Sequence, residues 1–329
     1  MSDPLGVLVI GAGDMGSRHA QHWAAAGADV IAVSDPDLAR AQASADLVGA
    51  AVCSTPDEIL KSGEVQVVSV CTPTFLHARY TLQALEAGKH VLCEKPIALT
   101  LEDAHAMKAA AEASGCELRI GFMRRFEPIF PKLREMIAGL GTPVMGSITI
   151  TAGVRPKRLM HDRKANGGPV IDMCCHIFDV WKLIFNGKPE LLHASGGILA
   201  EKSRALVGIE EKAVDSAAAT FGFPSGHTTQ LLVTWGLPEG VPFSEKHTYL
   251  SEHGLVEVDW NYRSNTVSLH DGVGVTRYGG ERDPWAAEIA QFHAELTEGA
   301  ERQVADADDG IEALELSLKI LEAVEGRSR

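Results

Sequence analysis

One segment near the start of the chain constrains its fold more than any other: an apolar run followed by three spaced glycines, Val7-Leu-Val-Ile-Gly11-Ala-Gly13-Asp-Met-Gly16. The apolar run is typical of a buried parallel strand, and residues 14–27 have the character of the helix that follows it. Gly11 permits the tight turn out of the strand, Gly13 lets a diphosphate approach the backbone, and Gly16 lets the helix pack closely on the strand. The segment therefore predicts a dinucleotide site, with the diphosphate on free N–H groups at the helix N-terminus.

A second apolar run, Val30-Ile-Ala-Val-Ser34, ends at an acid, Asp35, about 20 residues beyond the glycines. A carboxylate at this point accepts hydrogen bonds from a ribose diol and repels a 2′-phosphate, which favours NAD over NADP. Arg40 is within reach of the same loop, so NADP remains an alternative cofactor. Asp14 and Met15 begin the helix, and we expect them to bind the cofactor together with the glycines and Asp35.

Composition limits the classes of protein to which the chain can belong. A length of 329 residues favours two domains, and a formal net charge of −14 disfavours nucleic acid and anionic membranes as partners. The six cysteines form no CxxC pair, which favours a reduced, cytoplasmic setting. The chain enters its first strand almost at once, and no apolar run approaches the ~18 residues that span a bilayer.

Residues 1–122 alternate short apolar runs with helical stretches, the βαβ rhythm of a doubly wound parallel sheet. We expect strands at Leu5–Ile10, Val30–Ser34, Val65–Cys71, His90–Cys93 and Glu117–Gly121, and helices at Met15–Ala26, Leu38–Leu47, Thr74–Ala87 and Leu101–Ser114. Thr100 followed by Asp103 is typical of a helix N-cap, and Gly88 and Gly115 are expected to end helices. This part is predicted to be a Rossmann domain that binds NAD(P).

Residues 123–329 follow a different rhythm, and we expect an α+β domain with a large, mostly antiparallel open sheet. Helices are predicted at Pro128–Ala138, Asp172–Phe185, Pro284–Thr297 and Asp309–Val324, and strands at 189–198, 213–222, 227–236, 246–251, 254–259 and 266–278. One face of this sheet is expected to pack on its helices and the other to face a second subunit. The domain is predicted to serve in substrate binding and oligomerisation.

Two segments of the first domain combine strand ends with polar groups. Glu94-Lys95-Pro96 follows a predicted strand, where open α/β sheets place their ligands, and we expect Glu94 and Lys95 to bind the cofactor. The proline biases Lys95 away from helical backbone angles. Cys71-Thr72-Pro73 ends another strand and opens a helix. Thr72 and Pro73 are expected to line the coenzyme, with His77 as a neighbour that equally fits a first-turn surface residue.

Residues expected to act on the substrate come mainly from the second domain. In Asn166-Gly-Gly168-Pro-Val-Ile-Asp172-Met-Cys-Cys-His176, a spacing of four puts Asp172 and His176 one helical turn apart, where they can hold a hydroxyl group and its proton. A capping Asp and a core His fit the residues equally well. Asp172 and His176 would give only two metal ligands, and no further cluster of ligand residues is evident, so we predict no metal site.

The pocket wall is expected to contain aromatic and imidazole rings. His161, Trp235 and Trp285 are candidates, because a sugar ring presents C–H faces to aromatics and hydroxyls to imidazole. Arg124 and Arg125 mark the crossover between the domains, and one of them is predicted to face substrate hydroxyls or hold the domain interface.

In their order and spacing, these segments resemble the glucose-fructose oxidoreductase/inositol dehydrogenase family (Gfo/Idh/MocA). They are the glycine fingerprint, Cys71-Thr-Pro73 with His77, Glu94-Lys95-Pro96, Gly121-Phe-Met-Arg-Arg-Phe126, and Gly167-Gly168 through Asp172 to His176. The resemblance implies an NAD(P)-dependent oxidoreductase of a sugar or polyol that assembles as a dimer or tetramer. It also implies that Lys95 is the catalytic lysine, that Asp172 and His176 are its acid and histidine partners, and that Arg124 faces substrate. The segment Arg155–Lys164 does not resemble the inositol enzymes, which leaves the substrate open between an inositol-like polyol and a pyranose.

We therefore expect hydride transfer between nicotinamide and a secondary alcohol, with Lys95 or His176 taking the hydroxyl proton and Asp172 orienting the imidazole and the substrate. The residues do not decide which of the two is the immediate base. The alternatives are a reductase of a keto-sugar, imine or unsaturated substrate, and a non-catalytic NAD(H)-binding sensor.

Overall fold

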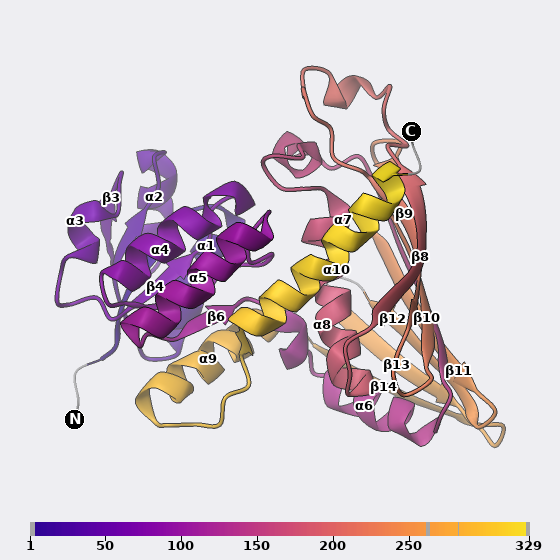
Figure 1. Ribbon diagram of the computed structural model, residues 1–329. Helices are drawn as coiled ribbons and strands as arrows, with labels where there is room; N and C mark the ends of the chain where they lie inside the picture. The colour runs from indigo at the N-terminus through magenta and orange to yellow at the C-terminus, as the bar shows by residue number, and fades with distance from the viewer. Residues whose placement is uncertain (1–3, 261–263, 282, 327–329) are drawn as a thin grey trace. The chain divides into compact units, whose positions relative to one another are not determined.

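The structure is a computed structural model that describes residues 4–260, 264–281 and 283–326. The chain forms two compact units, the first made of Met1–Phe126 and Asp283–Ile311 and the second of Glu127–Arg282 and Glu312–Arg329 (Figure 1). This division differs from the single cut after residue 122 expected from the sequence, because a segment close to the C-terminus returns to the first unit.

The first unit is built on a seven-stranded sheet in the order β15-β6-β5-β4-β1-β2-β3. Its strands are β1 (Gly6–Ile10), β2 (Asp29–Ser34), β3 (Ala51–Cys53), β4 (Val67–Val70), β5 (His90–Cys93), β6 (Leu118–Ile120) and β15 (Ala305–Asp306). Its helices are α1 (Asp14–Ala25), α2 (Leu38–Ala45), α3 (Asp57–Leu60), α4 (His77–Glu86), α5 (Leu101–Ser114) and α9 (Pro284–Thr297), with short 3₁₀ helices η1 (Thr74–Leu76) and η2 (Met123–Phe126). Every pairing is parallel except that of β15 with β6, which confirms the predicted Rossmann architecture.

Local sequence signals explain where several of these elements begin and end. The Thr100 side chain accepts a hydrogen bond from the Asp103 N–H and caps α5, and Gly115 ends that helix with a φ of +69°. Both features agree with the prediction from the sequence. The helix expected at 74–87 begins instead as η1 and continues as α4, while β3 and α3 are short elements at one edge of the sheet that were not predicted.

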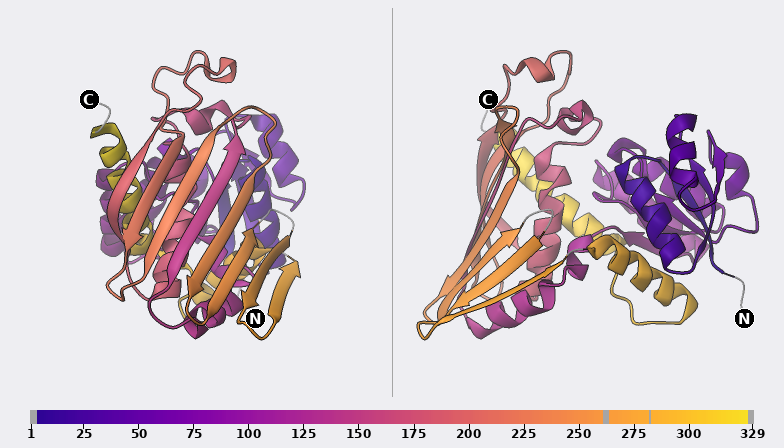
Figure 2. Two further views of the ribbon diagram at one scale, coloured as in Figure 1. Left: turned by 90° about the vertical axis from the view of Figure 1, so that its right-hand side faces the viewer. Right: turned by 180° about the vertical axis from the view of Figure 1, so that it is seen from behind.

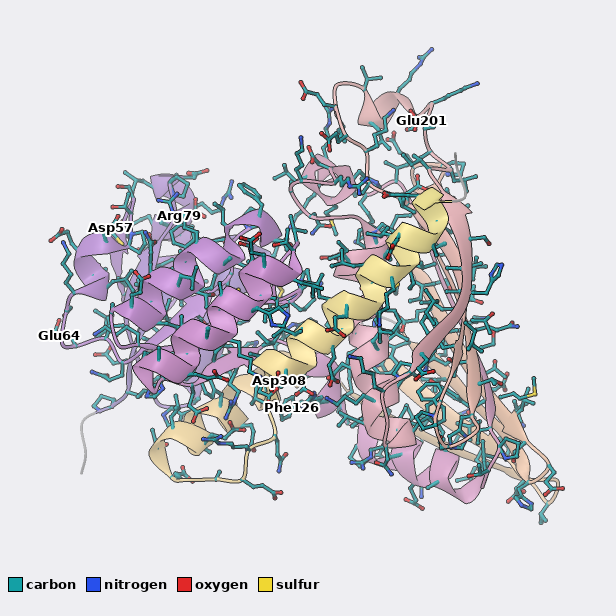
Figure 3. The ribbon with its side chains drawn as sticks, in the orientation of Figure 1. Asp57, Glu64, Arg79, Phe126, Glu201 and Asp308 are labelled. Carbon is teal, nitrogen blue, oxygen red and sulfur yellow. The ribbon has the colours of Figure 1, made fainter. Side chains whose placement is uncertain are left out.

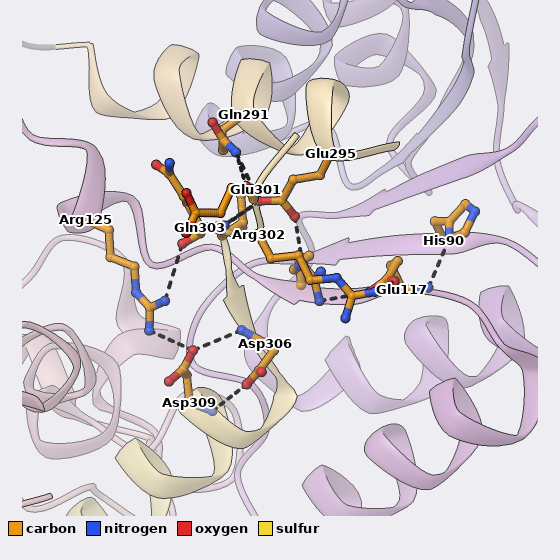
Figure 4. A network of polar contacts seen from close by, with 12 residues as sticks. His90, Glu117, Arg125, Gln291, Glu295, Glu301, Arg302, Gln303, Asp306 and Asp309 are labelled. Carbon is orange, nitrogen blue, oxygen red and sulfur yellow. Dashed lines mark hydrogen bonds and ion pairs between the residues drawn. The ribbon is translucent and has the colours of Figure 1, made fainter. Parts of the chain in front are cut away.

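A polar network explains why residues 283–311 belong to the first unit (Figure 4). The Arg119 guanidinium contacts the Glu295 carboxylate at 3.1 Å, and the same carboxylate accepts from the N–H groups of Gln303 and Val304. Burial raises the pKa of Glu295, but these bonds outweigh it and leave the pKa below its ordinary value. Helix α9 also packs on α1, where the rings of Trp23 and Phe292 lie 6.0 Å apart.

The second unit contains an eight-stranded sheet in the order β14-β13-β12-β11-β7-β10-β9-β8. Its strands are β7 (Met145–Gly153), β8 (Glu190–Gly197), β9 (Ser216–Gly222), β10 (Thr228–Leu237), β11 (Ser244–Ser251), β12 (Gly254–Trp260), β13 (Ser264–His270) and β14 (Val275–Glu281). Its helices are α6 (Phe130–Gly139), α7 (Pro169–Asp172), α8 (Cys174–Phe185) and the part of α10 (Ala307–Gly326) that follows Ile311, with 3₁₀ helices η3 (Arg158–His161) and η4 (Arg204–Leu206). Only β10 and β7 pair in parallel among the described strands of this sheet, which confirms the mostly antiparallel prediction.

The two faces of this sheet differ. Alternate side chains such as Ile148, Val233 and Tyr249 are buried on the side where the helices of the unit lie. The other face, turned to the viewer on the left of Figure 2, is open, and Met145 and Leu250 on it are 59% and 43% exposed. Contact of this face with a second subunit remains a prediction.

Three expectations for the second unit differ from the structure. β7 was not predicted, although its buried residues alternate with exposed ones. The single strand expected at 266–278 is the hairpin β13–β14, with Gly272 in its turn at a φ of +83°. The helix expected at 172–185 is α8, which begins at Cys174, and Asp172 instead ends the short helix α7, so Asp172 and His176 lie on different helices.

Many charged side chains lie on the outside of the two units, as Asp57, Glu64 and Arg79 of the first and Glu201 of the second illustrate (Figure 3). Across residues 4–260, 264–281 and 283–326, no helix combines the length and apolar character needed to cross a membrane.

Candidate active site

The polar groups of the first unit gather along one edge of its sheet. Strand register aligns Ile10 with Ser34 and Val70, and Val70 with Cys93, so Gly11, Asp35, Cys71 and Glu94 follow four neighbouring strands in one row. The strand order reverses between β1 and β4, since β1 continues to β2 on one side while β4 lies on the other. Ligands of open α/β sheets bind at such a reversal, beyond the carboxyl ends of the strands.

The three glycines of the fingerprint lie in different surroundings. Gly11 has a φ of +96°, and a Cβ there would lie 2.6 Å from the Cys71 carbonyl oxygen. A Cβ on Gly16 would lie 1.7 Å from the Gly11 carbonyl oxygen, so only glycine lets α1 pack this closely. A Cβ on Gly13 would meet nothing within 4 Å, which leaves the space open that a diphosphate needs.

Asp35 is held in place by two backbone groups. One carboxylate oxygen accepts from the Ala12 N–H at 2.8 Å and the other from the Asp37 N–H at 2.9 Å. These bonds aim the carboxylate while leaving lone pairs for further donors, as recognition of a ribose diol requires. Arg40, which kept NADP open, contacts the Asp37 carboxylate at 3.4 Å on the exposed surface.

Further features of this edge fit a dinucleotide. Gly13 is the N-cap of α1 and has no side-chain capping bond, so Asp14 and Met15 begin a helix whose first N–H groups face the open space at Gly13. The hydroxyl oxygen of Thr72 is buried and has no hydrogen-bond partner among the residues that the structure describes, as expected of a group that completes its bonds with a ligand. Pro73 beside it is exposed. These residues therefore fit a dinucleotide, and their contact with it remains a prediction.

The His77 side chain is buried against backbone carbonyl groups, so His77 is not a surface residue. Its ring is 1% exposed, with Nδ1 2.8 Å from the Pro96 carbonyl oxygen and Nε2 3.0 Å from the Thr72 carbonyl oxygen. Burial lowers its pKa, and the two carbonyl contacts oppose that effect. His77 thus links the loop that contains Lys95 to the segment after β4, and its contact with the cofactor stays a prediction.

Glu94 and Lys95 follow β5 directly. Glu94 is 6% exposed, and Lys95 is half-buried. Burial raises the pKa of Glu94, but the hydrogen bond from His19 and the nearby Lys95 ammonium oppose it, and the pKa lies below its ordinary value. An ionised carboxylate therefore stands next to Lys95.

The thiols of the same edge are not activated. Burial raises the pKa of Cys71 well above its ordinary value and that of Cys93 to about 12. Because the thiolate is the nucleophile, neither cysteine is suited to covalent catalysis at neutral pH.

In the second unit, a glycine turn positions the predicted acid. Gly167 and Gly168 have φ values of +82° and +75°, and a Cβ on Gly168 would lie 2.7 Å from the Ala213 side chain. This turn starts α7, and Asp172 at its end accepts from the Asn166 amide at 3.2 Å. His176 lies in the first turn of α8, and both side chains are buried. Their assignment to catalysis remains a prediction.

The predicted pocket wall of the second unit forms a contact cluster. His161 and Trp235 lie edge to face with 6.3 Å between ring centroids, and the Arg155 guanidinium lies 5.8 Å over the Trp235 ring. His161 Nε2 accepts from the Arg155 N–H, so its Nδ1 carries the proton in the neutral ring. Burial lowers the pKa of His161, which favours that neutral ring. Within the described part of the chain, His161 Nδ1 and Trp235 Nε1 are buried donors without an acceptor.

The two adjacent arginines of η2 lie in different surroundings. Arg125 pairs with Asp309 at 2.8 Å and with the Gln303 carbonyl, both within the first unit (Figure 4). Arg124 is 3% exposed, and its contact with substrate stays a prediction. Trp285, the third aromatic candidate, lies in the first unit with the Arg18 guanidinium 5.2 Å over its ring.

Comparison with known proteins identifies the family. Residues 5–122 match the oxidoreductase family with an NAD-binding Rossmann fold, and residues 130–248 match the Gfo/Idh/MocA C-terminal domain. The chain belongs to the Gfo/Idh/MocA family of oxidoreductases. The resemblance noted in the sequence is confirmed, and the first unit contains an NAD-binding Rossmann domain.

Three similar proteins illustrate the range of the family. D-glucoside 3-dehydrogenase of Escherichia coli is 36% identical over 189 residues, which cover 54% of this chain and 53% of that protein. Inositol 2-dehydrogenase of Rhizobium meliloti is 28% identical over 320 residues, which cover 94% of this chain and 93% of that one. The solved structure of UDP-N-acetylglucosamine 3-dehydrogenase from Acidithiobacillus ferrooxidans has 26% identity and a TM-score of 0.81, with 100% of both chains covered. The chain therefore spans about half of the first relative and nearly all of the second.

Sequence reasoning missed two polar residues beside this edge. His19 of α1 and Ser69 of β4 are fully buried and bonded to one another at 2.9 Å. The signal available in the sequence was Ser69 itself, a hydroxyl within the apolar run Val67-Val-Ser-Val70, because a buried hydroxyl requires a partner.

Proposed function

We propose that the protein is an NAD-dependent dehydrogenase that oxidises a secondary alcohol of a sugar or cyclic polyol. The observation that carries this proposal is the row at the carboxyl edge of the first sheet. There, Lys95 follows the strand next to β4, in line with the residues that fit a dinucleotide. Support for the substrate class comes from the relatives, since the two similar dehydrogenases act, by name, on a glucoside and on inositol.

The proposed chemistry assigns each residue one task. Bound NAD would supply the hydride acceptor. Lys95 would hold the reacting oxygen, and either Lys95 or His176 would take the hydroxyl proton, while Asp172 would orient the imidazole and the substrate. Arg124, His161 and Trp235 would bind the remainder of the substrate. The two buried donors His161 Nδ1 and Trp235 Nε1 support this, since sugar hydroxyl oxygens are acceptors.

A spectrophotometric screen tests the proposal. The purified protein is incubated near pH 9 with NAD or NADP and with inositols, aldoses, glycosides and sugar phosphates. We expect reduction of NAD by one of these classes. If NAD binds but the whole panel stays silent, the dehydrogenase assignment is wrong, and reduction of keto-sugars or sensing of NAD(H) becomes the better account.

Replacing Asp35 by Ser is expected to weaken the preference for NAD over NADP. The change removes the charge-assisted bonds to the ribose diol and the repulsion of a 2′-phosphate. Since a hydrogen bond to a charged group contributes roughly 1.5–3 kcal/mol, the ratio of kcat/KM values should fall by about 10- to 100-fold. Asp37→Ser is the matched control, because Asp37 is half-exposed and contacts Arg40. An unchanged ratio in Asp35→Ser would show that Asp35 does not select the cofactor.

A further inference from the structure

A chain of four side chains leads from the dinucleotide-binding helix to the backbone of Lys95. The Trp23 indole N–H donates to the Ser69 hydroxyl oxygen at 2.9 Å, and that hydroxyl lies 2.9 Å from His19 Nδ1. His19 Nε2 lies 3.1 Å from one Glu94 oxygen, and the other Glu94 oxygen accepts from the Lys95 N–H at 3.1 Å. Trp23, His19 and Ser69 are fully buried.

The donors in this chain can be assigned from the groups alone. Ser69 accepts from Trp23, so its own proton is available to His19 Nδ1. His19 then carries its proton on Nε2 and donates it to the Glu94 carboxylate. A neutral imidazole therefore satisfies every link, and reversing the tautomer would set a lone pair against the carboxylate.

We propose that His19 is a positioning residue for the reaction at Lys95: by donating to Glu94, it holds an ionised carboxylate against the lysine and fixes the Lys95 backbone. This inference rests on the proposed role of Lys95. His19 touches neither substrate nor cofactor in this proposal. Its location three residues after Gly16 means that the helix whose N-terminus fits the diphosphate also sets the charge beside the lysine.

The charge of Glu94 affects the pKa of Lys95 in one direction. Burial alone would drive Glu94 toward its neutral form, and the His19 bond is the largest contribution that opposes it. The other ionisable groups that interact with Glu94 include Lys95 on its own segment, His77 from α4, Cys71 after β4 and Cys93 at the end of β5. A carboxylate within about 4–6 Å of an ammonium group raises the pKa of the amine, so loss of the Glu94 charge should lower the pKa of Lys95.

A pair of substitutions separates the two bonds of His19. The amide nitrogen of Gln can replace Nε2 and reach Glu94, while the shorter Asn can replace Nδ1 and reach only Ser69. His19→Gln should therefore keep the properties of Lys95, and His19→Asn should change them. Both variants place a polar amide at the same buried position, so a general loss of stability affects them alike.

The readout is the pKa of Lys95 in the protein without cofactor. The rate of acetylation of Lys95 is measured against pH by peptide mass spectrometry, with the exposed Lys61 as the internal reference. In Glu94→Gln, which preserves shape and removes the charge, the titration should move about one unit or more to lower pH. His19→Asn should move in the same direction by a smaller amount, and His19→Gln should stay near the wild type.

The pH profile of kcat/KM provides a second readout. Because a base must be deprotonated to accept the alcohol proton, the acidic limb should move to lower pH in Glu94→Gln and His19→Asn. The proposal is overturned if His19→Asn leaves the Lys95 titration unchanged, or if His19→Gln changes it as much as His19→Asn does. A fully active Lys95→Ala variant would instead overturn the proposed function, while the acetylation result would still report on His19. If His19→Asn does not fold, an unshifted titration in Glu94→Gln is sufficient to refute the proposal.

Discussion

Lys95→Ala should abolish turnover while leaving NAD binding largely intact. The variant removes the amine that we propose holds the reacting oxygen and offers a base, and positioned proton transfer of this kind is typically worth about 10²–10⁴ in rate. The residues that fit the dinucleotide, Gly11, Gly13, Gly16 and Asp35, are not altered by the change. We therefore expect kcat to fall by that factor and the Kd for NAD, measured by tryptophan fluorescence, to change little.

Lys95→Arg distinguishes charge from proton transfer. Arginine keeps a positive charge but is not deprotonated at accessible pH, so it can hold an oxygen without acting as a base. If Lys95→Arg still binds substrate but has lost turnover, the result supports Lys95 as the base. Full activity of Lys95→Arg would exclude Lys95 as the base. Lys61→Ala, at a lysine whose side chain is 71% exposed, is the matched control and should behave as the wild type. A near wild-type rate in Lys95→Ala would remove this lysine from the mechanism.

The dinucleotide fold was predictable because its determinants are local. The fingerprint glycines act within about ten residues of one another, and the structure shows the expected steric reason at Gly11 and Gly16. At Gly13 it shows open space, and the approach of a diphosphate there stays a prediction. Position directly after a buried strand likewise located Asp35 and Lys95 at one edge, since parallel strands end on the same side of a sheet. These inferences needed only periodicity and the rules of parallel sheets.

Elements with weak local patterns escaped prediction. In β7, two of the buried positions are Gly146 and Ala152, which carry little apolar signal beside Ile148 and Ile150. The turn between β13 and β14 was readable in principle, because Asp271-Gly272 is a strong hairpin signal between two strands. The position of residues 283–311 in the first unit was not, because it depends on the pairing of Ala305 with Ile120, far away in the sequence.

The same distinction between local and distant contacts explains what was missed at the candidate site. Glu94 was expected to bind the cofactor, and that expectation is untested. Its contact with His19 joins residues 75 positions apart, and the contact of Ser69 with His19 spans 50. No periodicity in one sequence reports such a pair. A buried strand hydroxyl indicates only that a partner exists, and the fold is needed to identify it.

His176→Ala is expected to reduce kcat by about 10²–10⁴ if the imidazole is the immediate base, and by less if it only orients the substrate. His176 is buried in the first turn of α8, so the matched control is His253→Ala, at a histidine of the same unit whose side chain is 60% exposed. The control should leave kcat/KM unchanged. Asp172→Asn removes the charge of the proposed orienting group while keeping its shape, and it should lower kcat less than His176→Ala does.

The double variant Lys95→Ala, His176→Ala then decides between the two candidate bases. Groups that handle one proton act as a unit, and removal of either costs nearly as much as removal of both. If Lys95 and His176 share the hydroxyl proton, the double variant should be no slower than the slower single variant. If only Lys95 takes the proton and His176 contributes separate binding, the two losses should multiply in kcat/KM. Equal rates for the wild type and His176→Ala would exclude the imidazole from either role and leave Lys95 as the sole base.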